Sequence, residues 1–344
     1  MNHSGSVKWT SPSNIALVKY WGKHGRQLPR NGSISLTLSQ CVSETSIEYH
    51  IDSLQQGLVV DFAFEGKPNA AFGNRIEKYL ASVQDLVPWL TSAKLKIQSK
   101  NSFPHSSGIA SSASAMSAIA MCLVDMKKTI DGSNELDTIL ASNLARLGSG
   151  SASRSVISKL GQWGDCDLEG SSDEYAIAYG HHVDPIFHTY HDDICIVSAE
   201  EKSVSSTAGH GLMEKSVFAQ ARYTQANDRL YALTTAMKTA DLDQFIAIVE
   251  DEALTLHGLM LCSEPSFVLL EPNTIRIIDA IRAYRQETKI PVCFTLDAGP
   301  NIHMLYPHAY ANDIAEWRDN VIKPFCHNGR IINDQVGNGP NKLH

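Results

Sequence analysis

The chain has 344 residues, of which 43% are hydrophobic and 19% are charged, and its formal net charge is −8. This length allows two domains or one large one, and the composition is typical of a globular protein with a sizeable core. The acidic balance argues against nucleic acid as the main partner, because that role needs a basic surface, although a small anionic ligand is still possible. No run approaches the about 20 apolar residues of a membrane helix, so we expect no membrane partner.

The cysteines and the first residues indicate the compartment. Seven cysteines are widely spaced with no CxxC pair, and several lie in apolar runs, which is typical of buried free thiols in a reducing compartment. Residues 1–10 contain no apolar core of a secretion signal. The sequence therefore predicts a cytoplasmic protein.

In the first half, strands are predicted before helices. Alternation of polar and apolar residues predicts strands at 33–38, 45–51, 58–64 and 95–98. Apolar residues at helical spacing predict helices at 71–84, 114–126 and 134–147.

The second half mixes the two kinds of element. Strands are predicted at 194–198, 292–296 and 302–306, and helices at 213–237, 242–257 and 274–284. Strands and helices that are grouped without regular alternation favour an α+β architecture over a doubly wound parallel sheet. We expect a domain boundary near residues 185–195.

Residues 104–114 form a loop of small and hydroxyl residues that leads into the helix predicted at 114–126. Gly108 permits a tight turn. The unpaired backbone N–H groups of a helix start, with the positive end of the helix dipole behind them, make a site for phosphate. The loop lacks the Gly-Lys-Ser/Thr ending of a Walker loop, and taken alone it is more often ordinary helix capping.

Lys19 and Lys23 lie four residues apart, with Tyr20 and Trp21 between them. The two cations would hold an anionic substrate while the rings enclose it. Lys19 follows the apolar stretch 15–18, so we expect it to be partly buried. The alternative is a pair of solvated lysines beside a core tryptophan.

Residues 148–154 are a run of small residues that ends in an arginine. Ser149 and Ser151 have the spacing that points both hydroxyls to one side of an extended loop. The planar fork of Arg154 fits a carboxylate or phosphate in bidentate fashion. The alternative is a flexible turn with a surface arginine.

Asp297 follows the apolar strand predicted at 292–296 and precedes Ala298-Gly299-Pro300. A carboxylate in that place projects into a cleft, where it would orient or deprotonate a substrate hydroxyl, and a nearby lysine would keep it ionised. The alternative is an aspartate that caps a turn.

A run of histidines and aspartates between His181 and Asp193 has the residue types of a metal site. No cysteine or His-Glu pattern accompanies it. We therefore favour a solvated polar loop before the strand at 194–198, and a metal-binding protein is the weakest of the functional hypotheses.

Five segments, taken in order, resemble the GHMP family of small-molecule kinases and, within it, the diphosphomevalonate decarboxylases. They are residues 13–23, 103–112, 148–154, 204–207 and 295–301. The phosphate loop alone marks only the superfamily. The string Asn14-Ile15-Ala16 through Lys19-Tyr20-Trp21-Gly22-Lys23, together with Asp297-Ala298-Gly299-Pro300-Asn301, is specific to the decarboxylase branch.

This resemblance implies two α+β domains with the active site in a cleft between them. Residues 1–190 would carry the phosphate loop in a domain like domain 2 of ribosomal protein S5, and residues 191–344 would form a ferredoxin-like domain. The implied reaction uses ATP and Mg²⁺ to phosphorylate the C3 hydroxyl of mevalonate 5-diphosphate. Loss of that phosphate with CO2 then gives isopentenyl diphosphate, and the implied assembly is a homodimer.

The resemblance also implies roles for individual residues. Asp297 would act on the C3 hydroxyl, Lys19 would neutralise charge beside it, and Arg154 would hold the substrate carboxylate. The diphosphate and carboxylate end would be bound by Tyr20, Lys23, Arg75, Ser149 and Ser151. The ATP phosphates would be bound by Ser106, Ser107, Gly108, Ala110, Ser111 and Ser112, with Ser112 also near Mg²⁺ and Ser206 closing on the nucleotide or substrate side.

Three segments depart from the family's pattern, at His105-Ser106-Ser107, Gly209-His210 and Leu256-His257-Gly258. These departures leave open a decarboxylase that takes mevalonate 5-phosphate. A GHMP kinase without decarboxylation is disfavoured because Lys19 and Asp297 are both retained. A catalytically silent ligand-binding protein of this fold would be expected to lack the carboxylate or the arginine, and neither is missing.

Overall fold

A computed structural model describes residues 2–52, 54–104, 109–200 and 206–343. Within these residues, an eight-stranded sheet has the core order β14-β1-β4-β7-β5-β6, with β8 pairing with β4 and β9 with β8. Its strands are β1 His3–Val18, β4 Ser33–Ile51, β5 Val59–Phe64, β6 Lys67–Pro68, β7 Ala93–Asn101, β8 Leu160–Trp163, β9 Ala176–Ala178 and β14 Asn341–Lys342.

A second sheet of four strands has the order β11-β12-β10-β13. Its strands are β10 Tyr190–Cys195, β11 Cys293–Thr295, β12 Ile302–Pro307 and β13 Ile331–Gln335, and a separate hairpin is formed by β2 Lys23–His24 and β3 Leu28–Pro29. The α-helices of the described residues are α1 Ala70–Ser82, α2 Ser111–Asp131, α3 Thr138–Gly148, α4 Ala152–Ser155, α5 Ser206–Leu212, α6 Ala219–Thr239, α7 Leu242–Leu261, α8 Pro272–Thr288 and α9 Ala311–Trp317.

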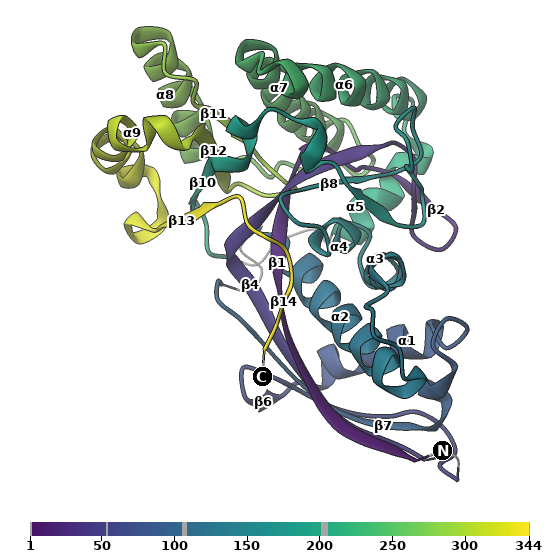
Figure 1. The fold of residues 1–344 in the computed structure, drawn as a ribbon. Helices are drawn as coiled ribbons and strands as arrows, with labels where there is room; N and C mark the ends of the chain where they lie inside the picture. Colours follow the sequence, from purple (N-terminus) through teal and green to yellow (C-terminus); the bar gives the residue numbers. More distant parts are fainter. Residues whose placement is uncertain (1, 53, 105–108, 201–205, 344) are drawn as a thin grey trace.

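The long strands β1 and β4 connect the two halves of the molecule (Figure 1). They pair antiparallel from His3↔Ile51 to Val18↔Ile34, with register shifts after Pro12 and after Ala16. Residues 11–18 of β1 are all buried, as in a strand that is covered on both faces. β1 therefore carries the chain from the first core to the second, and it delivers Lys19 there.

Among the described residues, four hydrophobic cores hold these layers together, the smallest around Trp21, Met213 and Met260. In the first, α1, α2 and α3 cover one face of the large sheet, where Ile119 and Leu123 pack with Ile47 and Ile97. In the second, α6 and α7 cover the far ends of β1 and β4. In the third, α8 and α9 pack on the four-stranded sheet.

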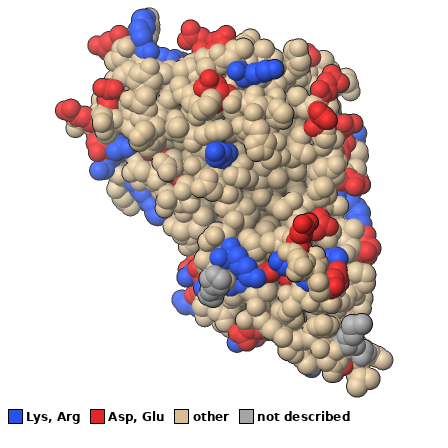
Figure 2. Space-filling model, viewed as in Figure 1, with Lys and Arg blue, Asp and Glu red and all other residues tan. Residues whose placement is uncertain are grey.

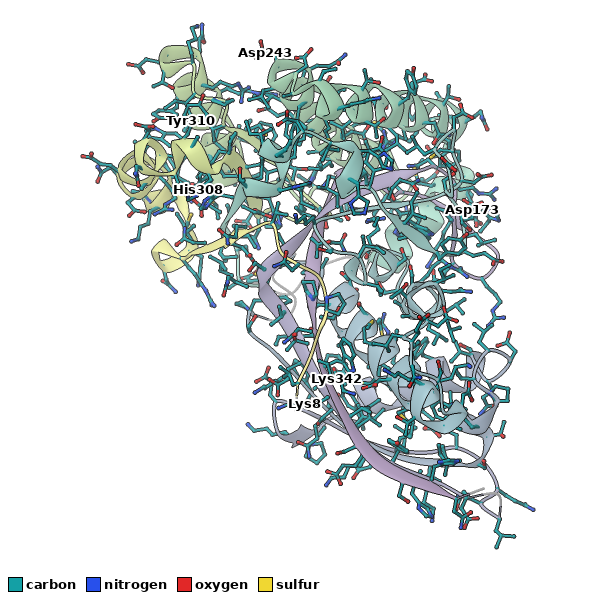
Figure 3. All side chains as sticks on the ribbon, in the orientation of Figure 1. Lys8, Asp173, Asp243, His308, Tyr310 and Lys342 are labelled. Carbon is teal, nitrogen blue, oxygen red and sulfur yellow. The ribbon has the colours of Figure 1, made fainter. Side chains whose placement is uncertain are left out.

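The last residues of the chain return to the first sheet. β14 pairs with β1 through Trp9↔Lys342, and Lys342 lies 2.8 Å from the Asp125 carboxylate in α2. Figure 3 places Lys342 beside Lys8, whose backbone carbonyl accepts the N–H of Leu343 at 2.8 Å. Apart from the separate β2–β3 hairpin, the strands before residue 190 thus form the eight-stranded sheet, and most of those from residue 190 onward form the four-stranded sheet. β14 at the end of the chain is the exception, because it belongs to the eight-stranded sheet. The division into 1–190 and 191–344 stays a prediction.

Several predicted elements differ in extent from those observed. The strands predicted at 33–38 and 45–51 form one strand, β4, because the Asp334 carboxylate accepts the backbone N–H groups of Ser39, Gln40 and Cys41 between them. The helix predicted at 213–237 is divided into a short turn at Met213–Lys215 and α6, which begins at Ala219. The helix predicted at 114–126 begins at Ser111.

The expectation of a solvated loop at His181–Asp193 is wrong for its last residues. Asp192 and Asp193 are buried in β10, where Asp192 lies 2.7 Å from His303 and Asp193 accepts hydrogen bonds from Tyr306 and Arg318. His181 and His182 are exposed. No group of three His, Cys, Asp or Glu side chains that could hold a metal ion occurs among the described residues.

The surface and the helices add two observations. In Figure 2, basic and acidic side chains are interspersed over the viewed face, and much of its middle is uncharged. Across the described ranges, no helix is long and apolar enough to cross a membrane.

Candidate active site

A buried ion pair joins Lys19, which follows β1, to Asp297, which follows β11. Lys19 Nζ lies 2.9 Å from Asp297 Oδ1, and it also donates to the carbonyl of Ala16 at 2.7 Å. The Lys19 side chain is 2% exposed and that of Asp297 is 28% exposed. Burial lowers the pKa of Lys19, while the negative charge of Asp297 opposes that shift. The alternative of a solvated Lys19 is therefore wrong.

Arg154 lies in α4 and is 2% exposed, so the alternative of a surface arginine is also wrong. Its Nε donates to Ser35 Oγ at 2.9 Å and its Nη1 to Ser33 Oγ at 2.7 Å. The guanidinium also lies 5.7 Å from the centre of the Trp163 ring. Burial lowers the pKa of Arg154 to about 10, with Asp297 and Tyr20 opposing, so the group is charged at neutral pH.

Arg154 and the ion pair share one site. Asp297 raises the pKa of both Arg154 and Lys19 through its charge, and Arg154 lowers that of Lys19. Contacts link the groups directly: Ser35, which accepts from Arg154 Nε, pairs with Ala16 across β4 and β1, and the Ala16 carbonyl accepts from Lys19 Nζ. The structure thus brings together the three residues that the sequence predicted to be catalytic.

Aromatic rings form a wall beside this site. The ring centre of Tyr20 lies 4.7 Å from that of Trp163 and 4.3 Å from that of His210. The Tyr20 hydroxyl is buried and has no hydrogen-bond partner among the described residues, and burial raises its pKa. A Cβ added at Gly150 would lie 2.9 Å from that hydroxyl, so the backbone of residues 148–154 approaches the ring closely.

Lys23 and Arg75 are two cations from different elements whose charges interact. Lys23 lies in β2 and donates to Gln27 Oε1 at 2.7 Å, whereas Arg75 is exposed on α1. Burial lowers the pKa of Lys23, and the positive charge of Arg75 adds to the shift. Two cations that repel each other across different elements are a favourable place for an anion.

The start of α2 meets the residues 148–154 at the same site. Ser112 Oγ lies 3.2 Å from Ser149 Oγ, and Ala110 before the helix has a left-handed backbone with φ 36°. Ser151 leads into α4, and its carbonyl accepts from Asn14 Nδ2 at 3.0 Å. The N–H of Ala113 is paired with the Ala110 carbonyl at 2.7 Å, whereas the N–H groups of Ser111 and Ser112 lie at a helix start, which leaves such groups without partners inside the helix.

Some predicted nucleotide-binding residues have no described geometry. Ser106, Ser107 and Gly108 lie outside the described residues. Ser111 is the first residue of α2 and Ser206 the first residue of α5, and the Ser206 side chain lies outside the description.

The sequence reasoning missed residues that support this site. Ser33 and Ser35 are two apart in β4, so their side chains share one face, and that spacing could have indicated a pair of hydroxyls. Glu252 accepts the backbone N–H of Lys19 at 2.8 Å, and His210 Nδ1 accepts that of Gly22 at 3.0 Å. No local pattern indicated either of these two contacts.

The fold and the site define a two-domain protein of mixed α/β structure with a buried Lys–Asp–Arg site. Residues 11–176 match the model of the diphosphomevalonate decarboxylase-like N-terminal domain, and residues 193–342 match that of the mevalonate 5-diphosphate decarboxylase C-terminal domain. The diphosphomevalonate decarboxylase of Ganoderma lucidum is 30% identical over 327 residues, which are 89% of this chain and 80% of that protein.

Solved structures agree with these matches. The mevalonate diphosphate decarboxylase of Staphylococcus aureus is 27% identical with a TM-score of 0.83, over 99% of both chains. A complex of MDDEF with MVAPP, AMPPCP and magnesium is 28% identical with a TM-score of 0.83, over 99% of this chain and 100% of that one. The chain belongs to the diphosphomevalonate decarboxylase family. The family resemblance predicted from the sequence is confirmed.

Proposed function

We propose that this chain converts mevalonate 5-diphosphate and ATP to isopentenyl diphosphate, ADP, phosphate and CO2, as an enzyme of the mevalonate pathway. The observation that carries the proposal is the Lys19–Asp297 ion pair within reach of Arg154, in a chain of this family. The proposal includes the domains 1–190 and 191–344, related to ribosomal protein S5 domain 2 and to ferredoxin-like folds. It also includes a cytoplasmic homodimer.

In the first step Asp297 orients the C3 hydroxyl and accepts its proton as the γ-phosphoryl group of ATP is transferred to that oxygen. A base must be ionised to act, and the ammonium of Lys19 at 2.9 Å favours the carboxylate form of Asp297. The same ammonium reduces the repulsion between the carboxylate and the incoming phosphoryl group.

In the second step the C3–O bond breaks, and its electron pair leaves with the phosphate. The bond to the carboxylate carbon breaks as well, and its pair forms the new double bond while CO2 departs. Arg154 orients the carboxylate through its guanidinium, because Ser33 and Ser35 fix the plane of that group. A tertiary alcohol is a poor leaving group, which explains why phosphorylation comes first.

The phosphate tail of the substrate would lie between Lys23 and Arg75, with Tyr20, Ser149 and Ser151 beside it. Support for this assignment comes from the charge of Arg75, which adds to the lowering of the Lys23 pKa by burial. Two cations suit a diphosphate, which carries more charge than a monophosphate.

The ATP phosphates would lie at the first turn of α2, held by the backbone at Ala110, Ser111 and Ser112, together with residues 106–108 and Ser206. The Ser112 hydroxyl is a hard oxygen donor that suits Mg²⁺, and phosphate oxygens would supply other ligands. Bound Mg²⁺ would neutralise charge on the phosphates. The relative solved with MVAPP, AMPPCP and magnesium supports this assignment.

The test is an assay of the purified chain with ATP, Mg²⁺ and either mevalonate 5-diphosphate or mevalonate 5-phosphate. ADP and CO2 are followed together, and we expect both in equal amounts from the diphosphate. ADP without CO2 would identify a kinase and reject the proposal. CO2 from the monophosphate alone would select the monophosphate decarboxylase, and neither product would indicate a silent ligand-binding protein.

A further inference from the structure

Both backbone polar groups of Lys19 are held by charged side chains from the helices above it, and its carbonyl also accepts from the neutral Asn31 side chain at 3.1 Å. Glu252 of α7 accepts the Lys19 N–H at 2.8 Å through Oε2, and Arg222 of α6 donates to the Lys19 carbonyl at 3.1 Å. Arg222 also donates to both oxygens of Glu252 at 2.7 Å. The two side chains are 1% and 0% exposed, so the whole arrangement is closed to water.

We propose that Glu252 and Arg222 are a positioning pair for Lys19: they fix its backbone so that its ammonium meets Asp297. This inference rests on the proposed function, in which the Lys19 ammonium assists Asp297.

A neutral acceptor would be enough to satisfy the Lys19 backbone. Residue 19 follows the last ladder position of β1, so its buried N–H and carbonyl need partners from elsewhere. A buried ion pair is an expensive way to supply them, because removing both charges from water costs more than a neutral hydrogen bond does. The charge of Glu252 therefore has an effect that a neutral side chain could not provide.

The charges around Lys19 show what that effect is. The charged groups that face it are Asp297 after β11, Glu252 on α7, Arg154 on α4 and Arg222 on α6. Burial acts most strongly against a protonated lysine, and the charge of Arg154 adds to that effect. The negative charges of Asp297 and Glu252 oppose these effects and favour the protonated lysine. Glu252 is itself buried, but the hydrogen bonds and the charge of Arg222 lower its pKa and keep it ionised.

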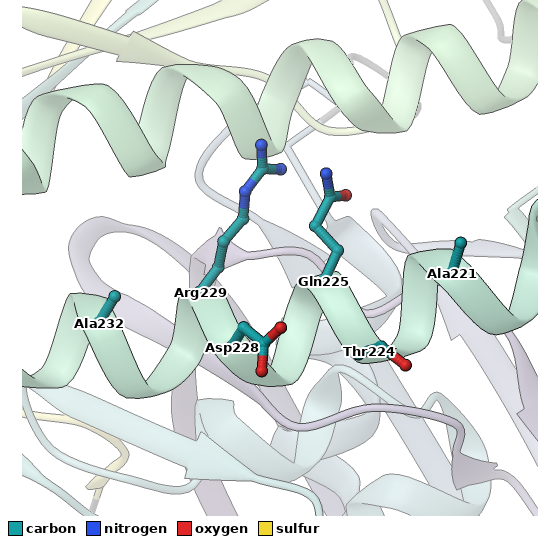
Figure 4. Close-up of a pocket in the computed structure, with 6 residues that line it drawn as sticks. All are labelled: Ala221, Thr224, Gln225, Asp228, Arg229 and Ala232. Atoms are coloured by element: carbon teal, nitrogen blue, oxygen red, sulfur yellow. The ribbon is translucent and has the colours of Figure 1, made fainter.

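Arg229 gives this arrangement a connection to the surface. Its Nη1 donates to Glu252 Oε1 at 2.9 Å, and its side chain is 20% exposed. It lines a hollow of about 570 Å³ on α6, where Arg229 and Gln225 extend toward the neighbouring helix (Figure 4). Because its cation offsets part of the Glu252 charge, removing it should strengthen the effect of Glu252 on Lys19.

The experiment compares the pH dependence of kcat in the Glu252→Gln and Arg229→Gln variants with that of the unmodified chain. If the Lys19 ammonium assists Asp297, activity falls at alkaline pH, where Lys19 loses its proton. We expect Glu252→Gln to move this loss down by about one pH unit and to lower kcat about 100-fold, with nucleotide affinity unchanged. Arg229→Gln should move the loss upward, and the matched control Asp228→Asn, an exposed residue of the same hollow, should not move it.

The inference would be overturned if both variants moved the alkaline loss of activity in the same direction. It would also be overturned if a folded Glu252→Gln variant lost activity at the same alkaline pH as the unmodified chain. If Glu252→Gln does not fold, the direction of the Arg229→Gln shift decides alone. The pKa of Lys19 is also read without turnover, by NMR of protein labelled with ¹³Cε-lysine. That readout separates the two failures: an inactive chain with the expected pKa shifts rejects the proposed function only, and an active chain without them rejects the positioning pair.

Discussion

His210 Nδ1 accepts the backbone N–H of Gly22 at 3.0 Å. The imidazole lies between two rings of the same segment, 4.3 Å from the centre of Tyr20 and 4.6 Å from that of Trp21. Helix α5 is thereby docked on the segment that carries Tyr20 and Lys23.

The first prediction concerns this docking contact. In His210→Leu the buried N–H of Gly22 loses its acceptor, which costs about 1–3 kcal/mol. We expect a KM for mevalonate 5-diphosphate raised by about tenfold, measured by steady-state kinetics at saturating ATP. His210→Asn, whose side-chain oxygen can accept the same N–H, should restore most of the loss. Equal losses in both variants would show that the ring itself, and not the acceptor, matters.

The second prediction concerns acid stability. Burial and the nearby Lys23 cation lower the pKa of His210 to about 3, so the folded chain holds a neutral imidazole. The unfolded chain binds a proton there at about pH 6.5. Unfolding therefore takes up a proton, and the free energy of unfolding contributed by His210 falls as pH drops from about 6.5 toward 3. Denaturant unfolding of His210→Asn between these values should show a shallower fall, and parallel curves for both proteins would contradict the assignment.

The third prediction tests the base. Asp297→Asn keeps the shape of the side chain but cannot accept the C3 hydroxyl proton, so kcat should fall by about 10²- to 10⁴-fold. Binding of an ATP analogue, measured by calorimetry, should not change. Asp228→Asn is the matched control, since it removes an exposed carboxylate from α6. Turnover within a factor of two of the unmodified enzyme would remove Asp297 from its role.

These assignments show how far sequence reasoning extends. The apolar stretch before Lys19 and the apolar strand before Asp297 indicated that each residue directly follows a buried element. The structure confirms this, because Lys19 follows the buried end of β1 and Asp297 follows the buried strand β11. Their pairing joins residues 278 positions apart, which no local pattern contains. The strand β1 was missed because its buried half includes Ser11, Ser13 and Asn14. Their polarity hid the strand, although each finds a buried partner, as Ser11 does in Ser117 at 2.5 Å.

The fourth prediction tests the orientation of Arg154. Arg154→Lys keeps the positive charge but loses the fork that Ser33 and Ser35 hold. We expect kcat/KM for mevalonate 5-diphosphate to fall by about 10- to 100-fold, because hydrogen bonds to a charged group are lost. Ser35→Ala should give a smaller effect in the same direction, since Ser33 still holds Nη1. If Ser35→Ala were as damaging as Arg154→Lys, the hydroxyl would have a role beyond orienting the guanidinium.

The last prediction uses two glycines of α5 as a matched pair. A Cβ added at Gly209 would lie 2.5 Å from the Trp21 ring, whereas one at Gly211 meets no described atom within 4 Å. Alanine raises helix propensity equally at both positions, so only the contact with Trp21 distinguishes them. Overpacking should make Gly209→Ala less stable by about 1–3 kcal/mol in thermal unfolding. It should also raise the KM for mevalonate 5-diphosphate, because the displaced helix withdraws His210 from Gly22. Gly211→Ala should match or exceed the stability of the unmodified chain, and similar behaviour of the two variants would mean that α5 does not dock on Trp21 in solution.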